Sequence, residues 1–149
     1  MKRWLYTDID CCTSFGLLLL RLVMGVAFIF HGWGKIQTPM GWMPPEVPIP
    51  GILQAAAAVS EFGGGIVLVL GLFTRVGAFF LAITMAVAAA FHIMNGDPFV
   101  ATGPGQNSWE PAASYLACSV LFVMAGAGRY SLDAVVFGRR DTIPPASVK

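Results

Sequence analysis

Four long apolar runs constrain the fold of this 149-residue chain more than any other feature. They cover residues 15–30, 51–73, 76–91 and 111–128, and the charged residues within them are Arg21 and Glu61. A helix that spans a bilayer needs about 20 mainly apolar residues, and each run reaches about that length with its flanks. Because lipid offers no hydrogen-bond partners, the backbone groups must be satisfied within each segment, which predicts helices.

The predicted fold is an all-α, integral membrane four-helix bundle with antiparallel neighbours. We expect helices at about residues 14–35, 51–72, 75–94 and 110–128, one domain over residues 1–138, and a flexible cytoplasmic tail over residues 139–149. Charged residues make up 11% of the chain, against about 25% in soluble proteins. The first run is predicted to stay as a helix rather than to be cleaved as a signal peptide, because it contains Arg21 and no small-x-small cleavage site follows it.

The positions of Lys and Arg predict the topology. If the N-terminus is cytoplasmic, Lys35 lies near the outer side of the membrane. The other basic residues that do not belong to an apolar run then lie on the inner side, namely Lys2, Arg3, Arg75, Arg129, Arg139, Arg140 and Lys149. Positive residues favour the cytoplasmic side, so both termini are predicted to be cytoplasmic. The formal net charge of +1 and the scattered basic residues exclude a nucleic-acid partner and leave the lipid bilayer as the expected surroundings.

The three cysteines, Cys11, Cys12 and Cys118, form no CxxC motif, which argues against a thioredoxin-like dithiol and against a cysteine zinc site. Cys11 and Cys12 are interpreted as unpaired thiols at the membrane edge, with lipidation and redox sensing as alternatives.

Arg21 and Glu61 require partners, because an ionisable group inside a membrane costs several kcal/mol unless it is paired or hydrated. At 100° per residue, Arg21 and Lys35 share one face of the first helix. The predicted partner of Arg21 is Glu61 on the antiparallel second helix. Two interpretations stay open: a salt bridge that only fixes helix packing, or charges that line a ligand or proton path.

A second group of ionisable residues is predicted at the outer boundary. His31 and Lys35 end the first helix, His92 ends the third, and Glu110 begins the fourth. Topology brings all four to the same membrane surface, which predicts a polar pocket there. The alternatives are interfacial hydrogen bonds for each histidine, a lysine that reaches the surface by itself, and metal or haem ligation by the two histidines. His31 lies about 80° from the Arg21–Lys35 face, which directs it toward the third or fourth helix.

Small residues repeat every four positions along the third helix, at Ala78, Ala82, Ala86 and Ala90. Such a stripe favours close packing within the bundle or between copies of the chain, so a homo-oligomer is one interpretation.

Three segments, "LLLLRLVMGVAFIFHGWGK", "EFGGGIVLVLGLFTRVGA" and "GAGRYSLD", resemble the DoxX family of small bacterial membrane proteins. The resemblance extends over about residues 17–133, and it departs from the family in the last motif, where Ala127 replaces the usual proline. Positions that match the family pattern are Arg21, His31, Gly32, Lys35, Glu61, Gly64, Gly65, Arg75 and Asp133.

The resemblance implies a multi-pass protein of the inner (plasma) membrane. The family takes its name from an association with thiosulfate:quinone oxidoreductase, and relatives are linked to oxidative-stress membrane complexes. The implied role is the membrane subunit of a quinone-linked or oxidative-stress redox system, with a quinone or a small sulfur anion near His31 and Lys35. Electron transfer would then need a bound cofactor or a redox enzyme subunit as partner. The alternatives are a non-catalytic assembly or anchoring protein, and a small proton-coupled transporter that uses Glu61.

Overall fold

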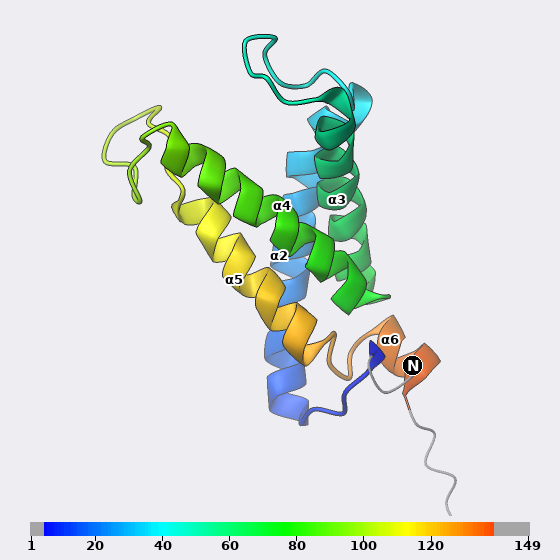
Figure 1. Cartoon of the computed structure of the whole chain (residues 1–149). Coiled ribbons are helices and arrows are strands. Elements are labelled where there is room, and N and C mark those ends of the chain that lie inside the picture. Colours follow the sequence, from blue (N-terminus) through cyan, green and yellow to red (C-terminus); the bar gives the residue numbers. More distant parts are fainter. Residues whose placement is uncertain (1–4, 139–149) are drawn as a thin grey trace, which may run out of the picture.

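The computed structural model describes residues 5–138, and every regular element within that range is a helix (Figure 1). These are α2 (Cys11–Gln37), α3 (Gly51–Leu70), α4 (Thr74–Met94), α5 (Glu110–Ala125) and α6 (Leu132–Phe137). The helices α2, α3 and α4 are long and apolar enough to cross a membrane, and α5 is a shorter apolar helix. The predicted all-α membrane bundle is confirmed. The orientation of the termini stays a prediction, and the tail at 139–149 lies outside the described residues.

The helix ends follow local signals that differ from the predicted bounds. α2 begins at Cys11 because Asp10 caps it, accepting a hydrogen bond of 2.9 Å from the backbone N–H of Thr13. α3 ends at Leu70 because Gly71 adopts a left-handed conformation with a φ of 65°. α6 follows α5 after a short loop and was not predicted, since its six residues form no long apolar run.

Glycines bring α2 and α3 into direct backbone contact. A Cβ atom added to Gly65 would lie 2.7 Å from the carbonyl oxygen of Gly25, and one added to Gly32 would lie 2.5 Å from the backbone nitrogen of Phe62. No side chain fits at either position without moving a helix. The small residues on these faces therefore set the antiparallel register of α2 and α3.

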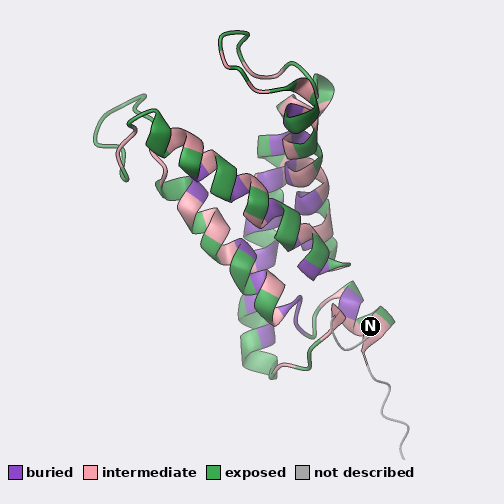
Figure 2. Cartoon of the chain, viewed as in Figure 1, coloured by how far each residue is buried: buried purple, intermediate pink, exposed green. Residues whose placement is uncertain are grey.

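The bundle is closed at one end and open at the other. The helices α4 and α5 lie side by side and diverge from α2 and α3 toward the end that carries the 38–50 and 95–109 loops (Figure 1). We call this the loop end, and the opposite end, next to α6, the α6 end. The buried core lies toward the centre and the α6 end (Figure 2), and it includes Leu17, Met24, Phe28, Leu68, Leu81 and Phe122.

The outer surface is largely apolar, as the surface of a membrane bundle must be. Val23 and Phe30 on α2 are each more than 70% exposed. On the α4 alanine stripe, Ala78 is buried in the bundle, whereas Ala86 and Ala90 are exposed. The stripe therefore packs within the bundle only at its α6 end.

Candidate functional site

Arg21 lies at the α6 end, where backbone carbonyls bind it. Its side chain is buried. Nη1 donates a hydrogen bond of 2.9 Å to the carbonyl oxygen of Ala127, and Nη2 donates one of 2.7 Å to the carbonyl oxygen of Tyr130. Both acceptors belong to the loop between α5 and α6. The predicted pair between Arg21 and Glu61 is wrong.

The reason is the register of α2 against α3. Arg21 packs against Gly71, where an added Cβ atom would collide with the guanidinium group. Glu61 lies ten positions earlier on α3, which is about 15 Å away along the helix axis. The guanidinium group therefore cannot bridge the distance.

Asp133 supplies the cap that α4 lacks. Its buried carboxylate accepts hydrogen bonds of 2.7 Å from the backbone N–H of Phe73 and 3.0 Å from that of Thr74. These are donors that the start of a helix leaves without intrahelical partners, and negative charge suits that end of the helix. The sequence marked Asp133 only as a family-pattern position, and nothing in its spacing indicated that it would cap a distant helix.

The two adjacent cysteines also lie at the α6 end, and both are exposed. The Sγ atom of Cys11 lies 2.9 Å from the hydroxyl oxygen of Tyr130. This hydrogen bond raises the pKa of Tyr130, because it favours the protonated phenol.

The partner of Glu61 is Lys35. The Nζ atom of Lys35 donates to both carboxylate oxygens, at 2.6 and 2.7 Å. The Glu61 side chain is 5% exposed and that of Lys35 is 27% exposed, so the carboxylate is the more deeply buried partner. The ammonium group also lies 4.6 Å from the ring centroid of Trp42, within the range of a cation–π contact.

Gln54 fastens the 38–50 loop above this ion pair. Its backbone carbonyl accepts a hydrogen bond of 2.9 Å from Nε1 of Trp42, and its side-chain oxygen accepts one of 3.1 Å from the backbone N–H of Met43. Its side-chain nitrogen donates 3.0 Å to the carbonyl oxygen of Ile49. The buried amide thus holds both arms of the loop, and no motif in the sequence indicates this role.

A cavity of about 550 Å³ lies between α3, α4 and the 38–50 loop, with the Lys35–Glu61 pair at one wall. Other lining residues are mainly apolar, among them Ala56, Ala57, Phe80, Ile83, Val87 and Phe91. Phe80, Ile83 and Val87 are also about half exposed on the lipid-facing surface, so this larger cavity opens sideways toward the membrane.

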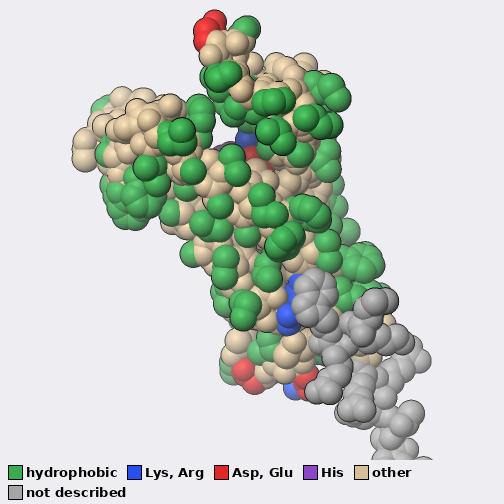
Figure 3. All heavy atoms as spheres, in the orientation of Figure 1, with side chains coloured by type: hydrophobic (Ala, Val, Ile, Leu, Met, Phe, Trp, Pro, Cys, Tyr) green, Lys and Arg blue, Asp and Glu red, His purple; other side chains and the backbone are tan. Residues whose placement is uncertain are grey.

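A smaller cavity of about 180 Å³ lies among α2, α4 and α5. Lys35, Glu61, Ala88 and His92 line both cavities, which therefore adjoin one another. Figure 3 shows the hollow at the loop end, with lysine, acidic and histidine side chains at its base. His31 lines the smaller cavity with its ring edge-on to Tyr115 at 6.0 Å between centroids, so it is directed toward the fourth membrane helix, α5.

The predicted outer cluster is brought together only in part. His31, Lys35 and His92 line the smaller cavity, whereas Glu110 is exposed and lines neither cavity. The Nδ1 atom of His92 lies 2.7 Å from a carboxylate oxygen of Asp97, a residue that was not among the predicted site residues. Within residues 5–138, no group of three His, Cys, Asp or Glu side chains is arranged to hold a metal ion.

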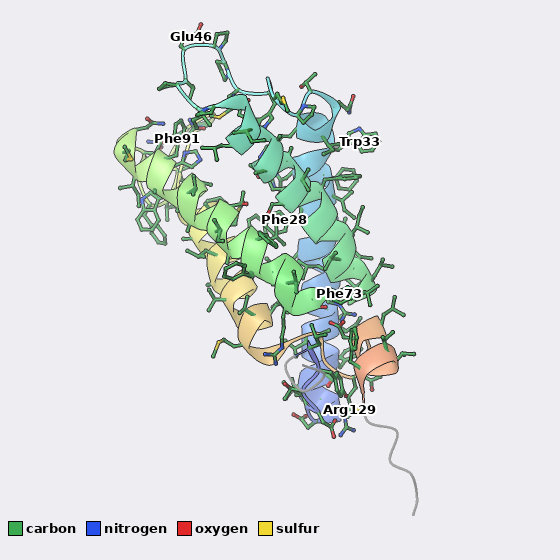
Figure 4. All side chains as sticks on the ribbon, turned by 45° about the vertical axis from the view of Figure 1, so that its right-hand side comes forward. Phe28, Trp33, Glu46, Phe73, Phe91 and Arg129 are labelled. Carbon is green, nitrogen blue, oxygen red and sulfur yellow. The ribbon has the colours of Figure 1, made fainter. Side chains whose placement is uncertain are left out.

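The aromatic residues of α2 have separate roles. Phe28 points into the bundle and contacts Tyr115 at 4.9 Å between ring centroids, whereas Trp33 points outward (Figure 4). Trp33 is exposed on the outer surface, and Phe28 lines the smaller cavity.

The DoxX family model matches residues 16–94, which include α3, α4 and nearly all of α2. The chain belongs to the DoxX family. An uncharacterised protein of Haemophilus influenzae is 36% identical over 81% of this chain and 90% of its own length. Inner membrane protein YqjF of Escherichia coli is 30% identical over 81% of this chain and 92% of its own length.

A third relative carries a name that refers to chemistry. The Bacillus subtilis protein named "Putative oxidoreductase CatD" is 27% identical over 82% of this chain and 87% of its own length. No solved structure matches this DoxX-family chain. The family and the helical structure together establish a multi-pass membrane protein.

Proposed function

We propose that this DoxX-family chain is the quinone-binding membrane subunit of a redox system in the inner membrane. The observation that carries the proposal is the larger cavity, whose apolar walls end at the Lys35–Glu61 pair and His92. Its volume of about 550 Å³ lies within the range of roughly 300–1,000 Å³ of small-molecule sites.

The shape and position of the cavity suit a ligand that arrives from lipid. A quinone has a flat apolar ring and a long tail, and it is dissolved in the bilayer. Ala57 and Ile83 lie on facing walls from α3 and α4, and the opening past Val87 leads toward the membrane. The ring would lie between the helices while the tail extends into lipid.

The polar wall suits the chemistry of the ring oxygens. A quinone oxygen accepts hydrogen bonds, and the ammonium group of Lys35 is a donor at this wall. The imidazole of His92 donates to the quinone oxygen from Nε2 in its protonated form, because Nδ1 is bonded to Asp97. Reduction to the quinol adds two electrons and two protons. In this proposal the electrons come from a redox enzyme subunit, and Glu61 and His92 exchange the protons. The name of the CatD relative supports a redox role.

The test is quinone binding by the full chain in lipid nanodiscs. Binding of a short-tailed quinone is followed by the quenching of tryptophan emission, because Trp42 lines the cavity. Ala57→Leu fills the space between the helices and is expected to weaken binding at least about tenfold, since overpacking costs about 1–3 kcal/mol. The matched control is Ala86→Leu on α4, which is exposed and lines neither cavity.

Saturable binding that is lost in Ala57→Leu and retained in Ala86→Leu supports the proposal. Absence of saturable binding by the unaltered chain would refute it and would favour a non-catalytic anchoring role. Equal affinity in the two variants would show that the quinone binds elsewhere.

A further inference from the structure

The smaller cavity shares Glu61 with the quinone site but is otherwise lined mainly by other residues. The larger cavity contacts the ion pair from between α3 and α4, and the smaller one contacts it from between α2, α4 and α5. A quinone in the larger cavity does not occupy this second space. The Glu61 carboxylate therefore borders both the ligand site and the smaller cavity.

The smaller cavity has the size and lining that hold water. Its volume of about 180 Å³ has room for about six water molecules, at about 30 Å³ for each molecule in the liquid. His31, Lys35, Glu61 and His92 supply polar atoms around it. Dry cavities in proteins are lined by apolar groups alone, and this one is not.

The smaller cavity also has a proton-exchanging group at the surface. His31 is exposed at the loop end while it lines the cavity, and Tyr115 contacts its ring from α5. Imidazole is the side chain best suited to exchange protons with water near neutral pH.

We infer that the smaller cavity is a water-filled proton path between Glu61 and the aqueous phase at the loop end, with His31 as the residue that exchanges protons with bulk water. The inference rests on the proposed function and names the proton route of that site. When two electrons from the redox partner reduce the quinone, an O–H bond of protonated Glu61 breaks as one forms on a quinone oxygen, and His92 supplies the proton for the other oxygen. Protons from bulk water then pass from His31 through the water in the cavity and reprotonate Glu61 and His92.

Charged and titratable groups on several helices surround the carboxylate. Lys35 binds it from α2, and His92 lies at the same wall on α4 with Asp97 as its partner. Tyr115 lines the path from α5. A proton that arrives on Glu61 weakens its ion pair with Lys35, so the protonation of Glu61 changes the surroundings of Trp42 above Lys35.

The first test measures whether water enters the smaller cavity. Ala112→Cys and Ala89→Cys are made in a chain carrying Cys11→Ser, Cys12→Ser and Cys118→Ala. Ala112 and Ala89 are each 8% exposed, but only Ala112 lines the cavity. In nanodiscs, a charged thiol reagent is expected to modify the cysteine at 112 at least about tenfold faster, because a dry thiol reacts only after local opening.

The second test measures the proton itself. Protons are released by a light flash, and the emission of Trp42 is followed with the other tryptophans replaced by phenylalanine. Ala112→Leu, which plugs the path, is expected to slow the response roughly 100-fold relative to Ala89→Leu. This factor is the lower limit of the rate gain from a positioned proton-transfer group. His31→Phe is expected to slow it as well. The final emission change should stay the same in each variant, because the path alters the rate and not the equilibrium.

Equal labelling at positions 112 and 89 would overturn the water-filled path, and equal rates in Ala112→Leu and Ala89→Leu would overturn its role in proton transfer. Neither experiment contains a quinone. Failure of quinone binding would therefore refute the proposed function and leave both of these results standing.

Discussion

Replacing Lys35 by methionine is expected to destabilise the bundle more than replacing Glu61 by glutamine. Methionine keeps the apolar stem and removes the group that donates to both carboxylate oxygens. Glu61 is 5% exposed, so its carboxylate loses its charged partner and stays out of bulk water. Breaking a buried pair in this way costs about 3–5 kcal/mol.

Replacing Glu61 by glutamine instead leaves the charge of Lys35, which also contacts Trp42. In Glu61→Gln the amide oxygen accepts one hydrogen bond from Lys35, whose side chain is 27% exposed and still lies over Trp42. The expected cost is about 1–2 kcal/mol, the range for a weakened hydrogen bond to a charged group. The double variant should cost about as much as Glu61→Gln alone, because no charge is then left unpaired.

Reversible unfolding of the purified chain in mixed micelles, followed by near-ultraviolet circular dichroism, measures all three free energies. The matched control is Arg129→Met, which removes the ion pair with Asp8 at the surface of the α6 end. Because Arg129 and Asp8 are 49% and 70% exposed, the expected change is below about 1 kcal/mol. Equal costs for the two single variants, or an additive double variant, would refute the assignment of a buried carboxylate that depends on Lys35.

Three further substitutions test the remaining contacts. Gly65→Ala should separate α2 from α3 and cost more than about 2 kcal/mol in the same unfolding assay. The control is Gly63→Ala, since no atom lies within 4 Å of a Cβ added there. This control should be neutral or should stabilise α3 by up to about 1 kcal/mol. Asp133→Ala should cost about 1–3 kcal/mol by the same measurement, because it leaves two backbone N–H groups at the start of α4 without acceptors, and Asp133→Asn should recover part of that loss. Cys11→Ala should lower the pKa of Tyr130 toward its ordinary value, because it removes the hydrogen bond that favours the protonated phenol; a spectrophotometric titration, with Tyr130→Phe as the blank, measures this change.

The helices could be predicted because length and hydropathy act on every residue of a membrane segment. The apolar runs between Phe15 and Gly128 have no other stable form in lipid, so their number and class follow from composition alone. The same periodicity identified the face that Lys35 shares with Arg21. It also directed His31 away from that face, and the contact with Tyr115 agrees with that direction.

The partners of the charged residues could not be predicted. Helical periodicity shows which residues share a face, but it does not give the position along the neighbouring helix that they contact. Direct glycine contacts set that level, and they place Lys35 beside Glu61. Arg21 is bound by loop carbonyls, and a backbone carbonyl leaves no mark in the sequence. Gln54 and Asp133 act on distant segments for which helical spacing contains no information.

The open loop end follows from where the polar contacts lie. At the α6 end, Arg21 joins α2 to the α5–α6 loop, and Asp133 joins α6 to the start of α4, so the helices are tied across the bundle. At the loop end, Lys35–Glu61 joins α2 only to α3, and His92 bonds to Asp97 in the segment that follows its own helix. Between the pairs, the hydroxyl of Thr84 on α4 donates a hydrogen bond of 2.9 Å to that of Ser60 on α3, next to Glu61. The two pairs diverge from this level toward the loop end (Figure 1). Both cavities lie in that divergence, with the ion pair at their common wall. In the proposed function, the larger cavity takes a ligand from lipid and the smaller one exchanges protons with water, while the α6 end stays unchanged.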